Sequence, residues 1–324
     1  MSTTRYLTDS EMGILLTAAG QAPSMHNTQP WRFEINGPVI DVLVDADRTL
    51  PAADPGGRLT RVGLGAAAFN IRVAAAMLGH ETTLAIDPDP ATPAVVVRIF
   101  LADGTEPVAG LSSLYDAIGL RFTYRGPMLD KPISPRMTQL LADAANAERA
   151  KLHWLDEEQR AQLGATIQAA DQREVVEEDR VHERARWIGG DRGADGVPDS
   201  VLGPLPDRPA AVRDLSAGFD HPHRSQAVFE ATPIIAILGT VDDDERAWVR
   251  AGLALQRVLL TATSYELAAS FANQAVEYPP LRDNVRTLIG RDIWPQMILR
   301  IGYPAEGAGL TPRRPWSATV DRRR

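Results

Sequence analysis

The stretch "MGILLTAAGQAPSMHNTQPWRFEI", residues 12–35, predicts a helix, a polar loop and a short strand in succession. Thr8 or Asp9 is suited to cap the helix, apolar residues follow at helical spacing, and the helix has to end before Pro23. Residues 137–155, "MTQLLADAANAERAKLHWL", give the same order of helix and strand, with the same Leu-Leu and Ala-Ala pairs. The chain therefore starts the same pattern twice.

The later elements repeat as well. An apolar helix is expected at 61–80 and again at 246–270, and a strand is expected after each one, at 95–104 and 297–307. In the first copy an Asn-Gly pair at positions 36 and 37 also predicts a tight hairpin between two strands. A fixed order of matching elements is typical of an internal duplication, although helices and strands of any origin can look alike.

The two copies differ in where their polar residues lie. The loop before the strand in the first copy is replaced by "NAERAK" (146–151) in the second, and the second copy begins with "LRFTYRGPM" (120–128), which the first lacks. The second copy also carries an insertion at 171–232, which starts as a highly charged helix and continues as a Gly- and Pro-rich loop. Long segments of this kind are lids or disordered loops, and we expect a lid.

Composition limits the kinds of ligand and location. The 324 residues include no cysteine, which excludes disulfides, thiolate nucleophiles and Cys-rich metal sites, and fits a reducing cytoplasm. No cationic start is followed by an apolar run, and no long apolar segment is present, so we expect neither a secreted nor a membrane protein. A net charge of −8 argues against a nucleic-acid partner.

The polar loop at 21–30 contains more hydrogen-bonding side chains than a turn needs. One or two such residues satisfy the backbone of a surface turn, yet this loop has Ser24, His26, Asn27, Thr28 and Gln29. The excess suggests a ligand. His26 can either contact that ligand or cap its own loop.

A second group of residues predicts an anion site. In an extended segment, residues i, i+2 and i+4 point to one side, so Arg121, Thr123 and Arg125 would place two guanidinium groups and a hydroxyl together. Each charge-assisted hydrogen bond from such a group contributes roughly 1.5 to 3 kcal/mol. A solvated basic turn is the alternative, but Arg313 and Arg314 form a further basic pair near the C-terminus.

Other motifs have simpler interpretations. "GLGAAA" (63–68) matches part of a dinucleotide-binding motif, but it follows a loop instead of a strand, so close helix packing is the better interpretation. His182, His221 and His223 are expected to be loop histidines, and no metal site is predicted. Ser24 has no evident acid and histidine partners that would make it a hydrolase nucleophile.

Several of these segments resemble the nitroreductase superfamily. "APSMHNTQPWRF" is similar to the family's flavin-facing loop, "RFTYR" to its phosphate clamp and "TPRRP" to its closing basic pair. Three longer segments resemble the Acg-type branch more narrowly, and they are "DADRTLPAADPGGRLTRVGLGAAAFNIRVA" (45–74), "GLALQRVLLTATSYELAASFANQAVE" (252–277) and "PQMILRIGYP" (295–304).

This resemblance implies an α+β, nitroreductase-like fold in which two tandem halves, 1–110 and 111–324, mimic the family's usual homodimer. One FMN is then expected between the halves, beneath a lid formed by 171–232, and the chain is expected to be a monomer. The first half would supply the flavin-ring loop and the second half the phosphate clamp, so that one complete site remains.

The resemblance also implies roles for particular residues. The ring would lie along the loop that contains Pro23, Ser24, Met25, His26, Asn27 and Gln29, and the phosphate would contact Arg121, Thr123, Arg125 and either Arg313 or Arg314. Asn273 and Gln274 would lie near the reactive edge of the flavin, where relatives often have an acidic residue and a glycine. No protein residue needs to act as a catalytic group, because the cofactor carries the electrons.

The implied function is NAD(P)H-dependent reduction of nitro-aromatic or quinone-like acceptors, with a small aromatic acceptor as partner. The alternative is a protein that holds or shields FMN beneath its lid with little or no NAD(P)H-dependent turnover. If the insertion covers the ring, the nicotinamide cannot stack on it. A nucleotide-binding dehydrogenase built on "GLGAAA" is a third, weaker reading.

Overall fold

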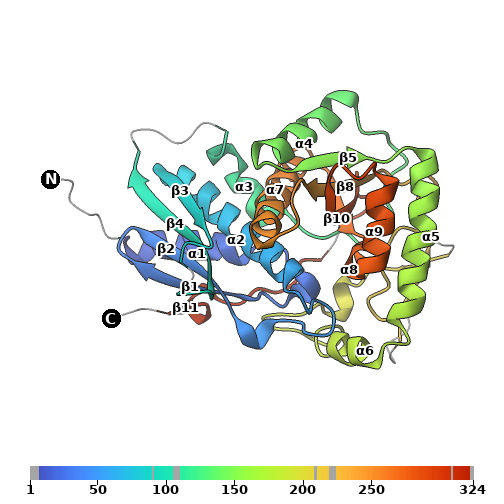
Figure 1. Ribbon diagram of the computed structural model, residues 1–324, viewed down its shortest axis with the longest axis horizontal. Helices are drawn as coiled ribbons and strands as arrows, with labels where there is room; N and C mark the ends of the chain where they lie inside the picture. The colour runs from blue at the N-terminus through green and yellow to red at the C-terminus, as the bar shows by residue number, and fades with distance from the viewer. Residues whose placement is uncertain are drawn as a thin grey trace.

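The computed structural model describes residues 7–89, 91–104, 110–207, 210–218, 224–307 and 309–321. It contains both helices and strands, and its two main sheets lie on either side of two long helices, α2 (Arg58–Met77) and α7 (Glu245–Ser264) (Figure 1). The fold is therefore α+β, as predicted.

The first sheet is built by the N-terminal third of the chain. Its strands are β1 (Trp31–Asn36), β2 (Val39–Val44), β3 (His80–Ile86) and β4 (Val95–Asp103), with the order β1-β2-β4-β3. The predicted Asn-Gly hairpin joins β1 to β2, and Gly37 has the positive φ of 59° that such a turn requires.

The second sheet is built from β5 (Lys151–Trp154), β8 (Ile235–Thr240), β9 (Ala268–Phe271) and β10 (Trp294–Gly302). Its order is β5-β8-β10-β9, and all its neighbouring strands are antiparallel. If the strands of each sheet are numbered separately in chain order, leaving out the C-terminal strand that joins the first sheet, the two sheets have the same strand order. In chain order, α2 lies between β2 and β3, and α7 lies between β8 and β9, so each long helix connects the second strand of its sheet to the third.

The helices begin where their capping residues predict. Thr8, and not Asp9, caps α1 (Asp9–Gly20) through a reciprocal capping box with Glu11. Ser134 caps α4 (Pro135–Ala147), which has proline at its first position. The short helix α3 (Tyr115–Leu120) ends where the chain becomes extended at Arg121.

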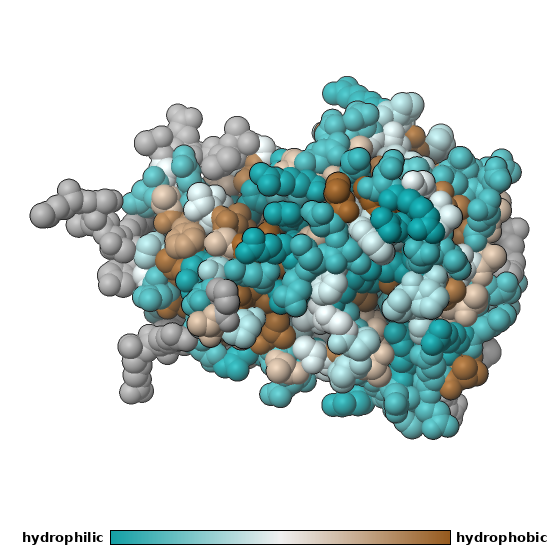
Figure 2. Space-filling model, viewed as in Figure 1, coloured by the Kyte–Doolittle hydropathy of each residue, from teal (hydrophilic) through white to brown (hydrophobic). Residues whose placement is uncertain are grey.

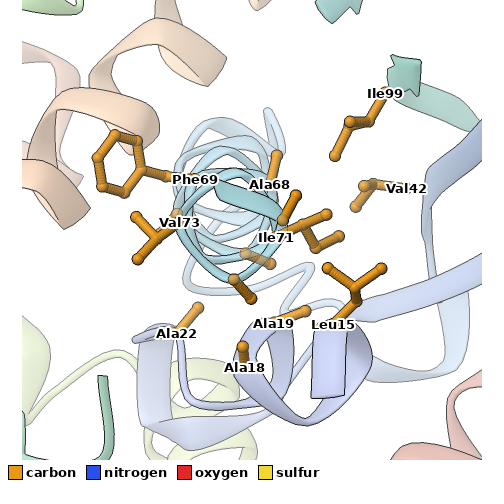
Figure 3. Packing of buried hydrophobic residues seen from close by; sticks show 14 of the residues in the cluster. Leu15, Ala18, Ala19, Ala22, Val42, Ala68, Phe69, Ile71, Val73 and Ile99 are labelled. Carbon is orange, nitrogen blue, oxygen red and sulfur yellow. The ribbon is translucent and has the colours of Figure 1, made fainter. Parts of the chain in front are cut away.

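The glycines of α2 and α7 determine how closely these helices approach. A Cβ atom on Gly65 would overlap the backbone carbonyl of Val249, and one on Gly252 would overlap that of Val62. "GLGAAA" is thus a helix-packing segment inside α2. Figure 3 shows Leu15 and other residues of α1 packed against one side of α2, while Phe69 points away toward α7.

The insertion differs from its predicted form. Instead of one charged helix that starts at 171, α5 (Glu157–Glu174) begins well before the insertion, and α6 (Glu178–Ala185) follows after a break. Asp156 and Gln159 form a capping box that fixes the earlier start. The described residues that follow include a short 3₁₀ helix, η4 (Asp199–Val201), and the short paired strands β6 (Leu205–Pro206) and β7 (Gln226–Ala227).

The chain then completes the second half and returns to the first. The helices α8 (Gln274–Glu277) and α9 (Pro279–Leu288) pack beside α5, and β11 (Val320–Asp321) pairs in parallel with β1. In Figure 1, β11 accordingly lies beside β1. This return path carries Arg313 and Arg314 past the loop that precedes β1.

The surface is polar over most of the face in Figure 2, and apolar residues occur there in small groups. Among the described residues, no helix combines the length and the apolar composition that crossing a bilayer requires.

Candidate functional site

A cavity of about 830 Å³ is lined by residues that precede position 110, by residues that follow it, including part of 171–232, and by Thr311 and Arg313 near the C-terminus. Most of the sequence-predicted site residues lie in its wall. They are Pro23, Ser24, Met25, His26, Asn27, Arg121, Thr123, Arg125, Asn273 and Arg313. The cavity is therefore the candidate site.

The segment that contains the first two arginines is fixed against β9. Tyr124 donates its backbone N–H to the carbonyl of Ala269 at 2.9 Å, and Thr123 forms an isolated parallel bridge to the same residue. This pairing gives the segment the alternation of a strand, which buries Tyr124 on one side and leaves Arg121, Thr123 and Arg125 in the cavity wall.

Three arginines of the wall, Arg121, Arg125 and Arg313, have neutral partners. Arg121 donates to the carbonyl of Gln21 at 3.0 Å, Arg125 to that of Val201 at 3.2 Å, and Arg313 to Oδ1 of Asn27 at 2.9 Å. Within the described part of the chain, no carboxylate pairs with any of the three. The Nε atoms of Arg121 and Arg313 are buried and have no partner there at all.

Burial and mutual repulsion make this cluster electrostatically unfavourable by itself. Burial, together with the charges of Arg313 and Arg125, lowers the pKa of Arg121 to about 9. Burial, with Arg224 and Arg313, lowers the pKa of Arg125 to about 10, and burial lowers that of Arg313 to about 10. Uncompensated buried cations are rare in proteins, so the cluster is suited to bind an anion.

The loop from Pro23 to Gln29 has a strained backbone. His26, Asn27 and Gln29 have φ values of 51°, 56° and 52°, in the left-handed region that residues other than glycine seldom adopt. Such conformations cost about 1 to 3 kcal/mol each and cluster at functional sites. No sequence pattern predicted this strain.

The amides of this loop hold neighbouring backbone segments. Asn27 donates to the carbonyls of Gly196 at 2.8 Å and Pro312 at 2.9 Å, so its NH₂ group is fully used. Gln29 donates to the carbonyl of Ala194 at 2.9 Å and accepts from the backbone N–H of Arg314. Much of the excess of polar side chains in this loop thus serves contacts within the protein.

Three of the predicted residues lie behind the cavity wall. Gln29 and Gln274 are fully buried outside its lining, and Arg314 forms an ion pair with Asp45 at 3.3 Å. Of the basic pair at 313 and 314, only Arg313 therefore reaches the cavity. Asn273 lines it and also accepts a hydrogen bond from the backbone of Ile298 at 2.8 Å.

His26 presents an unpaired nitrogen. The residue is 6% exposed, it lines the cavity, and its Nε2 atom has no partner among the described residues. Burial and the charge of Arg213 hold the pKa of His26 well below its usual value. The ring is therefore neutral at pH 7.

Residues 194–196 of the insertion, here called the latch, are bound to the loop and to its neighbour Arg48. Arg48 forms an ion pair with Asp195 at 2.9 Å and donates to the carbonyl of Thr28 at 2.9 Å. Two hydrogen bonds join Gly196 and Asn27. The side-chain amide of Asn27 donates to the carbonyl of Gly196, and the backbone N–H of Gly196 donates to the carbonyl of Asn27. The latch is thus tied to Asn27 and Arg48 beside the cavity.

A buried ionic network lies in another part of the wall, and the sequence did not predict it. Arg213 bonds both Glu174 and Glu277, and Arg184 also contacts Glu174. These arginines lower the pKa of Glu174 to about 2 despite its burial. Here, unlike at Arg121, each buried cation has a carboxylate partner.

The described residues contain no group of three or more acidic or histidine side chains that could hold a metal ion. His182 is exposed on α6, and His221 and His223 lie outside the described residues.

Comparisons with known proteins give full-length relatives but no matching family model. "Putative NAD(P)H nitroreductase Rv3131" of Mycobacterium tuberculosis is 31% identical, and the alignment covers 95% of this chain and 90% of the relative. "Putative NAD(P)H nitroreductase acg" of the same organism is 29% identical over 92% of this chain and 91% of its own length.

Solved structures of nitroreductases match more weakly. One from Desulfitobacterium hafniense DCB-2, with bound FMN, covers 65% of this chain and 97% of its own, with 13% identity and a TM-score of 0.42. A TM-score this low leaves the sequence relatives as the stronger comparison.

Proposed function

This chain belongs to the Acg-type branch of the nitroreductase superfamily, and from that premise we propose that it is an FMN-dependent oxidoreductase. It would use NAD(P)H to reduce nitro-aromatic or quinone-like acceptors. The observation that carries the proposal is the group of three guanidiniums of Arg121, Arg125 and Arg313, which lie in the wall of a cavity of about 830 Å³ and have no carboxylate partners among the described residues.

The residues of this cluster fit the phosphate of FMN. A phosphate monoester carries about −1.5 to −2 charges and three acceptor oxygens at pH 7. Arg121, Arg125 and Arg313 would offset that charge, and the unpaired Nε atoms of Arg121 and Arg313 are donors without acceptors in the described protein. Thr123 and Thr311 add hydroxyls to the same wall.

The loop before β1 fits the flavin ring. Pro23 and Ser24 lie against Gly63 of α2. A Cβ atom added to Gly63 would be in van der Waals contact with the carbonyl oxygen of Pro23 at 3.6 Å and with Cβ of Ser24 at 3.7 Å. Leu59 and Val62 add apolar surface there. When bound, the flavin supplies reversible two-electron chemistry, and the chain supplies position, charge compensation and exclusion of water.

The two halves, 1–110 and 111–324, are proposed to be fused counterparts of a homodimer. The support is the equal strand order of the two sheets and the crossing of their equivalent helices, α2 and α7. The first half contributes the loop before β1 and the second contributes the arginine segment, so the chain would hold one FMN as a monomer.

One observation favours the alternative, a flavin-holding protein with little NAD(P)H-dependent turnover. The insertion, 171–232, lines the cavity, and the latch ties it to the loop proposed to face the ring. A lid held in this way would keep a nicotinamide from stacking on the flavin. The two functions therefore differ in how readily the latch opens.

The test is to count flavins per chain from the visible spectrum and then to add NADPH without oxygen. Loss of the yellow colour within the time of a turnover assay supports the reductase. Colour that persists with NADPH but is lost with dithionite supports the flavin-holding alternative. A colourless protein that binds no added FMN would refute both.

Asp195→Asn, which removes the ion pair of the latch with Arg48, sharpens this test. If the lid controls access, this variant should bleach faster with NADPH than the parent. Asp321→Asn is the matched control, because it removes an ion pair to Arg32 that lies on the first sheet, where both side chains are about half exposed. Equal effects of the two changes would contradict the lid.

A further inference from the structure

One face of α5 forms a wall of the cavity along the length of the helix. The residues of this face recur every three or four positions, which places them on one side of a helix. Among them are Ala161, Gly164, Gln168 and Asp171. A Cβ atom on Gly164 would meet nothing within 4 Å, so there is open space beside this part of the helix. A flat ring can lie against it.

Asp171 is an acidic residue on this face whose carboxyl group is held by a hydrogen bond from a buried side chain. The amide of Gln274 donates to Oδ1 of Asp171 at 3.1 Å. Gln274 is fully buried, and its Oε1 atom has no partner among the described residues. The carboxyl group of Asp171 is therefore oriented by a residue that does not itself line the cavity.

The surrounding charges leave Asp171 without a cationic partner in the described chain. On its own helix it faces Glu174, and from the segment 210–218 it faces Arg213 and Asp214. Arg213 bonds Glu174 and Glu277 of α8. The charged residues of α9, which also packs against α5, pair elsewhere, as Arg282 does with Asp243 and Asp283 with Arg291.

Asp171 is partly buried and lines the cavity. Burial is the main cause that raises its pKa to about 6, and the negative charge of Glu174 adds to this, while Gln274 and Arg213 oppose it. An acid with a pKa near the working pH is the kind that transfers protons efficiently.

We propose that Asp171 contacts the electron acceptor and donates the proton that completes its reduction, with Gln274 as the residue that positions the carboxyl. The proposal rests on the proposed flavin-dependent function. The acceptor would be a flat ring with a carbonyl or nitro oxygen, placed against Gly164 and Gln168, within reach of Asp171 on the next turn of the helix.

The step balances for a quinone. When bound and reduced, the flavin would supply a hydride, that is, two electrons and one proton, and one quinone oxygen would then carry a negative charge. The O–H bond of Asp171 breaks, its proton forms a bond to that oxygen, and a hydroquinone results. The Asp171 carboxylate is reprotonated from water before the next turnover.

The experiment isolates this step from NAD(P)H. Flavin-loaded protein is reduced with one equivalent of dithionite without oxygen and mixed with 1,4-benzoquinone between pH 5 and 8, and the return of the flavin absorbance is followed. The absence of cysteine removes the thiols with which this quinone would otherwise react. For the parent protein we expect the rate to fall as the pH rises through about 6.

Asp171→Asn should lower the rate at pH 5 by about 10²- to 10⁴-fold and remove its pH dependence. Glu158→Gln, an exposed change on the same helix, should leave both unchanged. Gln274→Leu removes a hydrogen bond that stabilises the carboxylate, so the midpoint of the profile should move to higher pH. Infrared difference spectra should show the same shift in the protonated carboxyl band of Asp171.

The outcomes separate this inference from the function on which it rests. If reduced parent protein returns its electrons to the quinone with the same rate and pH profile as Asp171→Asn, the inference is wrong and the reductase stands. If no quinone or nitro-aromatic compound reoxidises the parent protein at any pH, the proposed function fails, and this inference fails with it.

Discussion

Replacing Arg121 by methionine should stabilise the ligand-free protein while weakening its affinity for FMN. Burial and two neighbouring arginines lower the pKa of Arg121 to about 9, against a reference of roughly 12.5. Because one pKa unit corresponds to about 1.36 kcal/mol, the positive charge of Arg121 lowers the free energy of unfolding by up to about 5 kcal/mol. Loss of the hydrogen bond to Gln21 offsets about 1 kcal/mol of this.

The measurement is urea unfolding of flavin-free protein at pH 7 and pH 10. Because the pKa of Arg121 is lower in the folded state, the cost of its charge is complete below about pH 9 and declines as the pH rises further. The advantage of Arg121→Met should therefore be about 1 to 2 kcal/mol smaller at pH 10 than at pH 7.

Arg213→Met is the matched control, because Arg213 is a buried cavity arginine with two carboxylate partners, Glu174 and Glu277. Its loss leaves buried carboxylates unpaired, and destabilisation by about 3 to 5 kcal/mol is expected. If Arg121→Met destabilised the ligand-free protein as strongly as Arg213→Met, Arg121 would be a structural residue and the anion-site argument would be refuted.

Two further substitutions and one titration test other parts of the structure. Asp195→Asn removes the ion pair with Arg48, and should increase the rate of NADPH or dithionite bleaching by several-fold in stopped-flow measurements; an unchanged rate would count against the latch. Gly65→Ala places a methyl group where α2 and α7 touch and should lower the free energy of unfolding by about 1 to 3 kcal/mol, whereas Gly56→Ala, in open space, should change it little. His26 should show no protonation by NMR between pH 6 and 7, since burial and Arg213 lower its pKa; titration near 6.5 would contradict its burial.

Local elements were predictable because their signals are local. Helix caps such as Thr8, the Asn-Gly hairpin and the alternation of Arg121, Thr123 and Arg125 each depend on a few neighbouring residues. The start of α5 was predicted wrongly, although Asp156 and Gln159 match the capping-box pattern. The charged residues from 171 onward have a stronger helical pattern, and the helix was therefore expected to begin there.

The rest of the site depends on pairings that sequence spacing does not encode. Arg213 meets Glu174 and Glu277, which are 39 and 64 positions away, and Asn27 binds backbone carbonyls 169 and 285 positions away. Backbone carbonyls belong to every residue type, so no composition signal identifies those partners. The left-handed conformation of the loop before β1 is likewise imposed by tertiary contacts.

The reductase and the flavin-holding protein can be two ends of one opening equilibrium. The latch is held by two hydrogen bonds between Asn27 and Gly196, one from Gln29 to Ala194 and one from Arg48 to Asp195. At about 1 kcal/mol net for each bond, these contacts favour the closed state by about 4 kcal/mol, which corresponds to an open fraction on the order of 10⁻³.

An open fraction of that size would reduce the apparent rate of nicotinamide access by the same factor, without any change in the flavin itself. Three of the four bonds have a backbone carbonyl as the acceptor, so the ion pair to Asp195 is the one that a substitution on the latch removes most simply. Loss of one bond should raise the open fraction about fivefold. A fivefold gain in NADPH bleaching for Asp195→Asn, with the dithionite-reduced spectrum unchanged, would therefore locate the difference between the two functions in the latch.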